Sequence, residues 1–425
     1  MNFDEVVNRR GTNSLKWDVP ENELPLWVAD MDFATAPAVV DAIKKRTECA
    51  AFGYSIIPEE WNQAYVGWWK RRYNYEMDPE SLIFCTGVVP AISSIVRKVT
   101  TPAENVVILT PVYNIFFNSI VNNGRNVLQC PLRYDKATAD KCRANANQNV
   151  AGENCVADKT CNESGKNIAG ENCAAGVYSI DWDALEKALA NPQTSLLIFC
   201  NPHNPVGKIW TAEEMARVGE LCRKHSVTVI SDEIHCDLTK PDKRYIPFAS
   251  VSETCRDISI ACMAPTKTFN IAGLQTAAVS VANPTLRHKV WRGLNTDEVA
   301  EPNVFAIQAA IAAYNEGEPW LDELLQYIQG NRELVADFIA REIPQVKLID
   351  AEATYLLWLD CKDFCKRRGM NSAQLQQDLR DNAQVFLSDG SVYGDAGEGF
   401  MRMNIACPKA SLQDALNRLK AYFNK

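Results

Sequence analysis

The chain has 425 residues, of which 44 are basic and 53 acidic, so its formal charge at pH 7 is −9, and 47% of its residues are hydrophobic. This composition excludes disordered and collagen-like proteins and supplies enough apolar residues for a sizeable core. The acidic balance argues against nucleic acid or an anionic membrane as the main partner, because either needs a concentrated positive surface. An anionic ligand must therefore be held by a few local donors.

The N-terminal segment lacks the features of a secretory signal. Residues 1–5 (Met-Asn-Phe-Asp-Glu) are acidic where a signal peptide is basic, and no apolar run follows them. No uninterrupted apolar stretch is long enough to span a bilayer. We therefore expect a soluble cytoplasmic protein whose 15 cysteines are mostly reduced core residues. The cysteines include no Cys-x-x-Cys pair, and we predict no metal site.

Short β-branched runs alternate with helical patterns between about residues 81 and 281. These runs are almost continuously apolar, as expected of strands buried on both faces of a parallel sheet. They lie at 82–85, 105–109, 196–200, 227–230 and 258–261. Between them, Thr211 and Glu214 have the spacing of a capping box, which predicts a helix start. The alternation predicts a doubly wound α/β large domain that binds ligands at the carboxyl ends of its strands.

The rest of the chain predicts a second, smaller α+β domain. Residues 318–342 have the pattern of a long helix, and 346–359 and 399–406 that of strands. A final helix is expected from Ser411, capped in the Ser-x-x-Asp manner, and the first 50 or so residues are expected to pack with this domain. The predicted boundaries are 48–285 for the large domain, and 1–47 together with 286–425 for the small domain.

The segment 136–176 interrupts this pattern. It is rich in Asn, Ala, Gly, Lys and Cys, and its sequence at 149–155 returns almost unchanged at 167–173. With few large apolar residues it can bury little surface, and we predict a low-complexity surface insertion into the large domain. A redox or metal-binding device is the alternative for its four cysteines, Cys142, Cys155, Cys161 and Cys173.

Three of the predicted strands are followed by a polar residue that packing does not explain. Asn204 follows the strand at 196–200, Asp232 the strand at 227–230, and Lys267 the strand at 258–261. Because the carboxyl ends of parallel strands meet at one edge of a sheet, an amide, a carboxylate and an amine would line one crevice. Each alone has an ordinary explanation as a turn former, a cap or a solvated lysine.

Together these residue types suit pyridoxal 5'-phosphate (PLP). That cofactor needs an amine for covalent attachment, an acid to keep its ring nitrogen protonated, a donor to its ring oxygen and a cradle for its phosphate. Lys267 would supply the amine, Asp232 the acid and Asn204 the donor. The backbone amides at Gly87 and Val88, where a strand runs into a helix, would attract the phosphate.

The segments around these residues resemble the fold type I aminotransferase superfamily. They are Asn-Pro-Val-Gly at 204–207, Ser-Asp-Glu-Ile-His at 231–235, Pro-Thr-Lys-Thr-Phe-Asn at 265–270 and Arg-Met-Asn at 402–404. The segments at 24–33 (Leu-Pro-Leu-Trp-Val-Ala-Asp-Met-Asp-Phe) and 52–55 (Phe-Gly-Tyr-Ser) are similar, more narrowly, to the cystathionine β-lyase group of the MalY/PatB type. The resemblance covers nearly the whole chain outside the insertion. It implies a PLP-dependent transferase fold with a mainly parallel sheet in the large domain and a smaller α+β domain.

The resemblance implies the same roles for the residues already singled out. Lys267 is similar to the lysine that holds the cofactor, Asp232 to the partner of the ring nitrogen and Asn204 to the partner of the ring oxygen. Gly87 and Val88 look like the phosphate-binding backbone.

Three aromatic residues gain a cofactor role only from the resemblance. Tyr113 looks like the aromatic that stacks on the cofactor ring, with a core position beside Phe116 as the alternative. Tyr54 resembles a tyrosine that reaches the phosphate of the neighbouring subunit, which implies a homodimer with shared active sites, and a turn tyrosine is the alternative. His235 stands where many aminotransferases have a tyrosine that donates to the ring oxygen. The lyase-like relatives share this histidine.

Arg402 is expected to anchor the α-carboxylate of an amino-acid substrate. On the predicted strand Arg402 and Asn404 point to the same face because side chains alternate, and a guanidinium offers a planar fork that a carboxylate accepts at both oxygens. The resemblance implies the same role, and a salt-bridged structural arginine is the alternative. Trp27 and Asp30 lie in the segment that resembles the substrate-side loop of the family.

The resemblance implies a PLP-dependent carbon–sulfur β-lyase that converts L-cystathionine or a related L-cysteine S-conjugate to pyruvate, ammonia and a thiol. Lys267 would act as general base while Arg402 holds the substrate. An aminotransferase is the alternative, because transamination uses the same residues. A regulatory protein-binding role on the same fold is the alternative from another class, and the intact set of Lys267, Asp232 and Arg402 argues against it.

Overall fold

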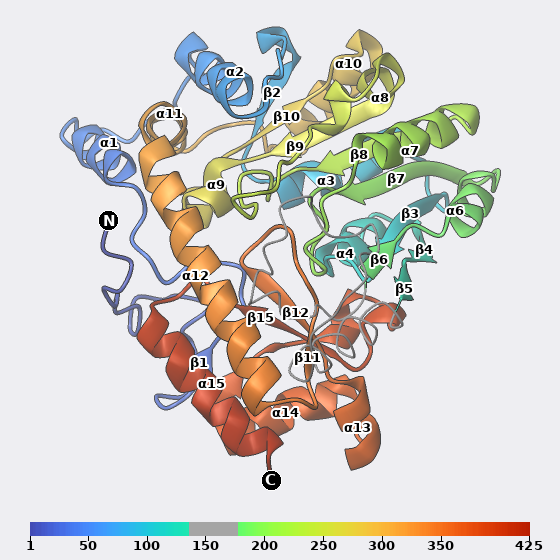
Figure 1. The fold of residues 1–425 in the computed structure, drawn as a ribbon. Helices are drawn as coiled ribbons and strands as arrows, with labels where there is room; N and C mark the ends of the chain where they lie inside the picture. Colours follow the sequence, from blue (N-terminus) through green and yellow to red (C-terminus); the bar gives the residue numbers. More distant parts are fainter. Residues whose placement is uncertain (136–176) are drawn as a thin grey trace, which may run out of the picture.

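The computed structural model describes residues 1–135 and 177–425, and its ribbon is drawn in Figure 1. The predicted insertion at 136–176, with its four cysteines, lies outside the described residues. In the part of the chain that is described, none of the helices has the length and apolar character needed to cross a membrane.

The larger sheet of the described residues is mainly parallel, as predicted. β10 runs antiparallel to both of its neighbours, and every other neighbouring pair is parallel. All five strands expected from the apolar runs are present, whereas β4 and β10 were not expected. The order across the sheet is β2 (Leu82–Cys85), β10 (Ala277–Ser280), β9 (Ser259–Met263), β8 (Thr228–Asp232), β7 (Thr194–Cys200), β3 (Asn105–Thr110) and β4 (Asn126–Pro131).

Helices cover both faces of this sheet. Because successive strand residues point to opposite faces, Val107 and Leu197 pack in one cluster while their neighbours Val106 and Leu196 pack in another. The first cluster joins the sheet to α6 (Trp182–Leu189), α7 (Ala212–Lys224) and α8 (Glu253–Ile258). The second joins it to α3 (Val88–Val99), α4 (Ile115–Val121) and α10 (Pro284–Thr296). The doubly wound arrangement therefore follows from strands that are apolar on both faces.

The two helix starts predicted from caps differ in outcome. The capping box of α7 is present, since the Glu214 amide donates to Thr211 Oγ1 (3.1 Å) and the Thr211 amide donates to the Glu214 carboxylate (2.9 Å). The expected cap at Ser411 was wrong, because α15 (Lys409–Phe423) already begins directly after Pro408, whose backbone is extended. No side chain caps α15, and Ser411 lies inside its first turn.

The second sheet is antiparallel and lies beside long helices. Its order within the described residues is β11 (Lys347–Leu348), β12 (Leu356–Asp360), β15 (Phe400–Asn404) and β14 (Ser388–Asp389). The expected strand at 346–359 is thus divided into β11 and β12. The helix predicted at 318–342 is α12 (Glu318–Glu342), and Figure 1 shows it in orange, running from the level of α9 (Pro265–Thr268) towards α14 (Ser372–Ala383). The neighbouring helices are α13 (Lys362–Arg368), α14 (Ser372–Ala383) and α15.

The N-terminal segment packs with the C-terminal part of the chain. β1 (Leu24–Pro25) pairs in parallel with β13 (Val385–Phe386), and α1 (Pro37–Thr47) packs on α11 (Ala306–Glu316). α11 also packs on α2 (Glu59–Tyr73). These contacts agree with the expected grouping of both chain ends, and the exact domain boundaries stay predictions.

The two ends of the undescribed stretch lie side by side. β5 (Arg133–Asp135) pairs antiparallel with β6 (Val177–Ser179), and Asp135 is opposite Val177. The chain therefore leaves the described fold and returns to it at one place.

Candidate active site

The three polar residues that follow the strands come together at one edge of the larger sheet. β7, β8 and β9 are neighbours. Asp232 is the last residue of β8, Asn204 follows β7, and Lys267 lies in the short helix α9 (Pro265–Thr268) that follows β9. Asn204 and Asp232 are buried and Lys267 is partly buried. The amide, carboxylate and amine predicted from the sequence therefore lie at the ends of neighbouring strands, at one edge of the larger sheet.

Lys267 has an amine whose proton is easily lost. Its pKa is lowered to about 8, chiefly by burial and also by the charge of Arg402, while the carboxylates of Asp30 and Asp232 act in the opposite direction. The amine Nζ donates a hydrogen bond to the carbonyl of Ala29. A lysine in this state is partly neutral near pH 8 and can act as a nucleophile or a base.

Asp232 is a buried carboxyl group that forms no ion pair with a cation of the described residues. Burial raises its pKa to about 7, although the amide of Ile234, 3.2 Å from Oδ1, and the amine of Lys267 both favour the ionised form. The neighbouring carboxylate of Glu233 raises the pKa further. A cation placed beside Asp232 would restore its charge.

Arg402 is a buried guanidinium on β15. Its Nη1 donates to Asn204 Oδ1 (3.2 Å), its Nη2 donates to the carbonyl of Trp27 (2.9 Å), and the ring of Tyr393 lies 5.0 Å from its central carbon. Its buried Nε has no hydrogen-bond partner, and among the described residues no carboxylate pairs with it. The alternative of a salt-bridged structural arginine is not what the described residues show.

Asn404, two residues beyond Arg402 on β15, faces the same way. Its side-chain amide donates to the carbonyls of Val28 and Asp30, each at 2.6 Å. The predicted shared face of Arg402 and Asn404 is therefore confirmed, and this face meets the segment around Trp27.

Trp27 and Asp30 adjoin the site mainly through their backbone. The indole of Trp27 stacks on Phe386, with centroids 4.8 Å apart. The carboxylate of Asp30 is paired with Arg9 at 2.7 Å and lies 3.8 Å from the amine of Lys16. Asp30 therefore acts on Lys267 by its charge rather than as a free acceptor.

His235 and Tyr113 lie within reach of the same charges. Burial, together with the charges of Lys267 and Arg402, lowers the pKa of His235 to about 3, so the imidazole is neutral at pH 7. Its Nδ1 is buried without a partner. Burial raises the pKa of Tyr113 to about 12, with Arg402 opposing the shift, and the tyrosine ring packs edge-on against Phe116 at 5.7 Å. The core alternative for Tyr113 therefore stays open.

Gly87 and Val88 form the start of α3. Gly87 is the N-cap residue, and no side chain caps the helix. The first amides of α3 therefore point towards the end of β2 without a side-chain acceptor, which is the arrangement that attracts an anion. A Cβ at Gly87 would lie 3.2 Å from Pro90 Cδ, so a larger residue would crowd this turn.

Tyr54 is not brought to the site within the single chain. It lies in the segment between α1 and α2 and its side chain is fully exposed. Phe52 and Ile56 in the same segment are also exposed.

Tyr355 is a residue of the site that the sequence did not reveal. Its hydroxyl donates to the carbonyl of Ala29 at 3.1 Å, the acceptor that Lys267 also uses, and its ring lies 6.2 Å from that of His235. Tyr355 opens the apolar run that forms β12, so the sequence indicates only a core strand there.

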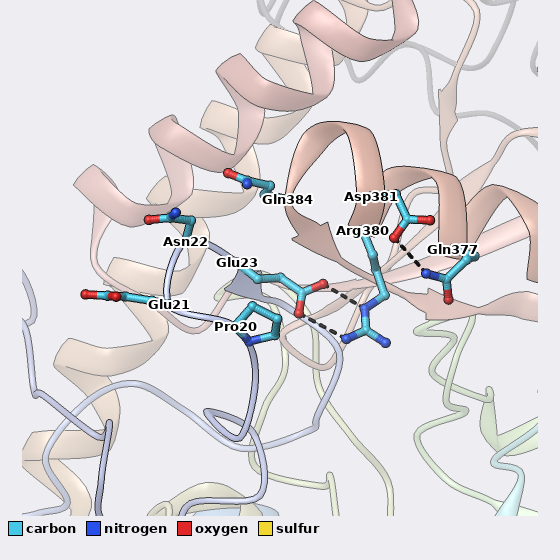
Figure 2. Close-up of a pocket in the computed structure, with 8 residues that line it drawn as sticks. All are labelled: Pro20, Glu21, Asn22, Glu23, Gln377, Arg380, Asp381 and Gln384. Carbon is cyan, nitrogen blue, oxygen red and sulfur yellow. Dashed lines mark hydrogen bonds and ion pairs between the residues drawn. The ribbon is translucent and has the colours of Figure 1, made fainter.

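A surface pocket of about 380 Å³ lies elsewhere. Figure 2 shows that Glu23 and Arg380 face each other across it, joined by hydrogen bonds of 2.7 and 3.0 Å. None of the predicted site residues lines this pocket, so it is separate from the candidate site.

The model of the aminotransferase class I and II family matches residues 21–157 and 172–419. The chain belongs to this family. It is 39% identical to cystathionine β-lyase PatB of Bacillus subtilis (strain 168), over 99% of each chain. A PLP-bound putative aminotransferase from Clostridium difficile 630 is 34% identical, with a TM-score of 0.86 and all of both chains covered. Cystalysin from Treponema denticola, which contains a PLP cofactor, is 30% identical with a TM-score of 0.86, covering 100% of this chain and 98% of cystalysin.

These likenesses confirm two predictions. The fold class is that of the PLP-dependent transferases, with a mainly parallel sheet and a second α+β part. The resemblance to the aminotransferase superfamily, and within it to the cystathionine β-lyase group, is also confirmed.

Proposed function

We propose that the protein is a PLP-dependent carbon–sulfur β-lyase acting on L-cystathionine or a related L-cysteine S-conjugate. One observation carries this proposal. The amine of Lys267, whose pKa is lowered, and the guanidinium of Arg402, whose Nε has no partner, both donate to carbonyl groups of one short backbone segment. The 39% identity to a cystathionine β-lyase over the whole chain supports the choice of reaction.

The residues of the site fit PLP. Asp232 is a buried carboxyl group that lacks a cationic partner, and a protonated pyridine nitrogen would provide one. The uncapped start of α3 at Gly87 suits the phosphate, and Lys267 supplies the amine for attachment. The buried, unpartnered Nδ1 of His235 and Nε of Arg402 leave polar atoms for the cofactor and substrate. Asn204 and Tyr113 complete the proposed cofactor contacts.

In this proposal Arg402 binds the α-carboxylate of the substrate. Its Nη1 and Nη2 each already donate one hydrogen bond, and the free Nε together with the remaining N–H groups can bind both oxygens of an α-carboxylate. The substrate amine would be held by the cofactor beside Lys267, so two points of the substrate are fixed and the Cα–H bond is oriented towards the Lys267 amine. Trp27 and Asp30 lie beside the proposed substrate position, where their backbone carbonyl groups accept hydrogen bonds from Arg402 and Asn404.

In this proposal Lys267 removes the proton from Cα of the substrate. When bound, PLP supplies an electron sink that stabilises negative charge at Cα. Lys267 Nζ takes the proton from Cα, the Cα–Cβ double bond forms, and the Cβ–S bond breaks with its electron pair on sulfur, so that a thiolate leaves. The released enamine is hydrolysed to pyruvate and ammonia. A pKa of about 8 leaves part of the Lys267 amine free to act as a base at neutral pH.

A panel of cysteine S-conjugates tests the proposal. The purified protein with added PLP should release pyruvate and thiol from L-cystathionine in equal amounts. Lys267→Ala should lose this activity, at least ~1,000-fold, because it removes both the attachment point and the base. Lys289→Ala is the matched control, since Lys289 is exposed on α10. Pyruvate release that survives in Lys267→Ala would contradict the assignment.

Amino-group transfer is the second candidate function. The observation that favours it is the likeness to the PLP-bound putative aminotransferase from Clostridium difficile 630. Transamination needs the same lysine, carboxylate and arginine and differs in where the Cα proton is returned. Incubation of cystathionine with 2-oxo acids would show a new amino acid without thiol release if this candidate is right.

We infer a homodimer with shared active sites. Tyr54 is fully exposed and Ile56 is 81% exposed, and Phe52 in the same segment is also exposed, and an apolar segment of this kind gains stability when a second copy covers it. In the dimer, Tyr54 would reach the phosphate bound at Gly87 of the partner. A cytoplasmic location is part of the proposal, supported by the 11 free cysteines of the described residues.

A further inference from the structure

Segment 26–33 offers backbone acceptors to the two proposed reacting groups. Arg402 Nη2 donates to the carbonyl of Trp27 at 2.9 Å, and Lys267 Nζ donates to the carbonyl of Ala29. These two groups therefore take their positions from one short stretch of chain. Whatever fixes this stretch fixes the distance between the amine and the guanidinium.

Lys16 forms hydrogen bonds near both ends of this segment. Its side chain is fully buried, and its amine donates to Asp32 Oδ2 at 2.8 Å and to the carbonyl of Asp30 at 3.2 Å. Its own carbonyl accepts a hydrogen bond from the indole Nε1 of Trp27 at 3.3 Å. One residue thus holds the segment on both sides of Ala29.

Arg9 bridges the two carboxylates of the same segment. Its guanidinium donates to both oxygens of Asp30, at 2.7 and 3.1 Å, and to Asp32 Oδ1 at 3.1 Å. It also donates to the carbonyl of Met31 at 3.0 Å. Two cations and two carboxylates therefore form one connected group along the segment, and Trp17 Nε1 adds a hydrogen bond to Asp32 Oδ1 at 2.8 Å.

We infer that Arg9 and Lys16 are positioning residues of the active site, which hold segment 26–33 so that its carbonyls align Lys267 and Arg402. The inference rests on the proposed function in giving those two residues the reacting roles. Neither cation needs to touch substrate or cofactor, because each acts through the carboxylates and carbonyls of the segment. The buried charge of Lys16 is compensated by the carboxylates of Asp32 and Asp30, so the amine and the segment are held to each other.

The group also sets the charge that Lys267 experiences. It is neutral as a whole, and removal of one member leaves a net charge beside the amine. Loss of Arg9 leaves an excess negative charge, which favours the protonated amine, whereas loss of the Asp30 charge disfavours it. The other charged or titratable groups of the described residues that lie near the Lys267 amine are Arg402, Asp232, His235 and Tyr355, and none of them is replaced in these variants.

The test measures the protonation of Lys267 without using catalysis. In the full chain freed of PLP, the rate at which an amine-reactive reagent modifies Lys267 is followed by mass spectrometry as the pH is raised. Arg9→Gln should move the midpoint of this profile up, and Asp30→Asn should move it down, each by about half a pH unit or more. The double variant Arg9→Gln/Asp30→Asn should return it towards the wild-type value.

Arg10→Gln is the matched control. Arg10 also binds the N-terminal segment, through the carbonyls of Val19 and Glu23, but it does not contact segment 26–33, so its replacement should leave the midpoint unchanged. Equal midpoints in both single variants, or shifts of the same sign, would overturn the inference. If Lys16→Met folds, it should shift the midpoint in the same direction as Arg9→Gln.

The same variants separate this inference from the proposed reaction. With PLP and L-cystathionine, a misplaced pair of Lys267 and Arg402 should lower kcat about 10-fold or more in Arg9→Gln, and the double variant should regain part of that loss. If the wild-type protein releases no pyruvate but the labelling midpoints shift as expected, the proposed function fails and the positioning role stands.

Discussion

Lys267 Nζ and Arg402 Nη2 donate to carbonyl groups that are two residues apart in the chain, those of Ala29 and Trp27. The lysine follows the larger sheet and the arginine belongs to the smaller one. The candidate active site therefore lies where residues from both sheets meet the N-terminal segment, and an amino acid held between Lys267 and Arg402 would lie across this junction.

The guanidinium geometry of Arg402 leads to the first prediction. Arg402→Lys keeps the charge but removes the planar fork, and the ammonium cannot bind both carboxylate oxygens while also serving Asn204 and Trp27. We expect KM for L-cystathionine to rise about 10- to 100-fold, with a smaller change in kcat. Steady-state pyruvate release measures both constants.

A decarboxylated substrate analogue checks that the effect comes from carboxylate binding. An amine that lacks the α-carboxylate should bind the wild-type protein and Arg402→Lys with similar, low affinity. Arg97→Lys serves as the control, because this half-exposed arginine on α3 pairs, among the described residues, with Asp297, which lies outside the site. A KM that is unchanged in Arg402→Lys would contradict the assigned anchor.

The sequence predicted most of the larger sheet and of the residues that follow its strands. Strands buried on both faces are recognisable as apolar runs, and a polar residue after such a run is conspicuous, as at Asp232. β10 escaped prediction because Ala277–Ser280 is short and made mostly of small residues. The start of α15 was misplaced because a proline at its N-cap decided the boundary rather than the side chain of Ser411.

The remaining part of the site depends on contacts between distant segments. Arg9 and Lys16 are ordinary basic residues in the sequence, and only the fold shows that Lys16 is fully buried against Asp32. Tyr355 likewise gains its role from the position of the Ala29 carbonyl, 326 residues away in the chain. No local pattern encodes such pairings, because they depend on tertiary contacts.

The second prediction concerns the insertion at 136–176. Because Asp135 and Val177 lie opposite each other in an antiparallel pair, a two-residue Asn-Gly turn can replace the segment. We expect the shortened protein to keep its pyruvate release and its melting temperature within a few degrees, since the segment has too few large apolar residues to add to the core. A large loss of activity with unchanged melting would instead assign the segment a role in the reaction.

The third prediction tests whether active sites are shared. Lys267→Ala and Tyr54→Ala should each be nearly inactive as pure dimers, because every site lacks one residue. After mixing and exchange of subunits, half of the dimers would combine the two variants, and one of their two sites would be intact. Mixing should therefore restore up to about a quarter of the wild-type activity. An inactive mixture, with exchange shown by mass spectrometry, would place Tyr54 outside the partner's site.

The fourth prediction follows from the burial of Asp232. Its pKa is about 7 in the folded protein against 3.8 ordinarily, so between about pH 4 and pH 7 the folded state holds a proton that the unfolded state has lost. The free energy of unfolding therefore falls as pH rises through this window. Asp232→Asn removes this titration, and in PLP-free protein its stability relative to wild type should increase with pH, by on the order of 2 to 4 kcal/mol in total.

Asp232→Asn should increase the stability of the PLP-free protein at higher pH but weaken its binding of the cofactor. Measuring both properties distinguishes a cofactor role of Asp232 from the effect of its burial alone. Asp232→Asn cannot pair with a protonated ring nitrogen, so it should bind PLP more weakly than the wild-type protein. Glu233→Gln is the matched control, because burial also raises the pKa of Glu233 to about 7 but its carboxylate is held by Ser231 and the amide of Phe248. Glu233→Gln should show the same pH dependence of stability as Asp232→Asn, but it should bind PLP as tightly as the wild-type protein. Equal loss of affinity in both variants would remove Asp232 from its proposed place beside the cofactor.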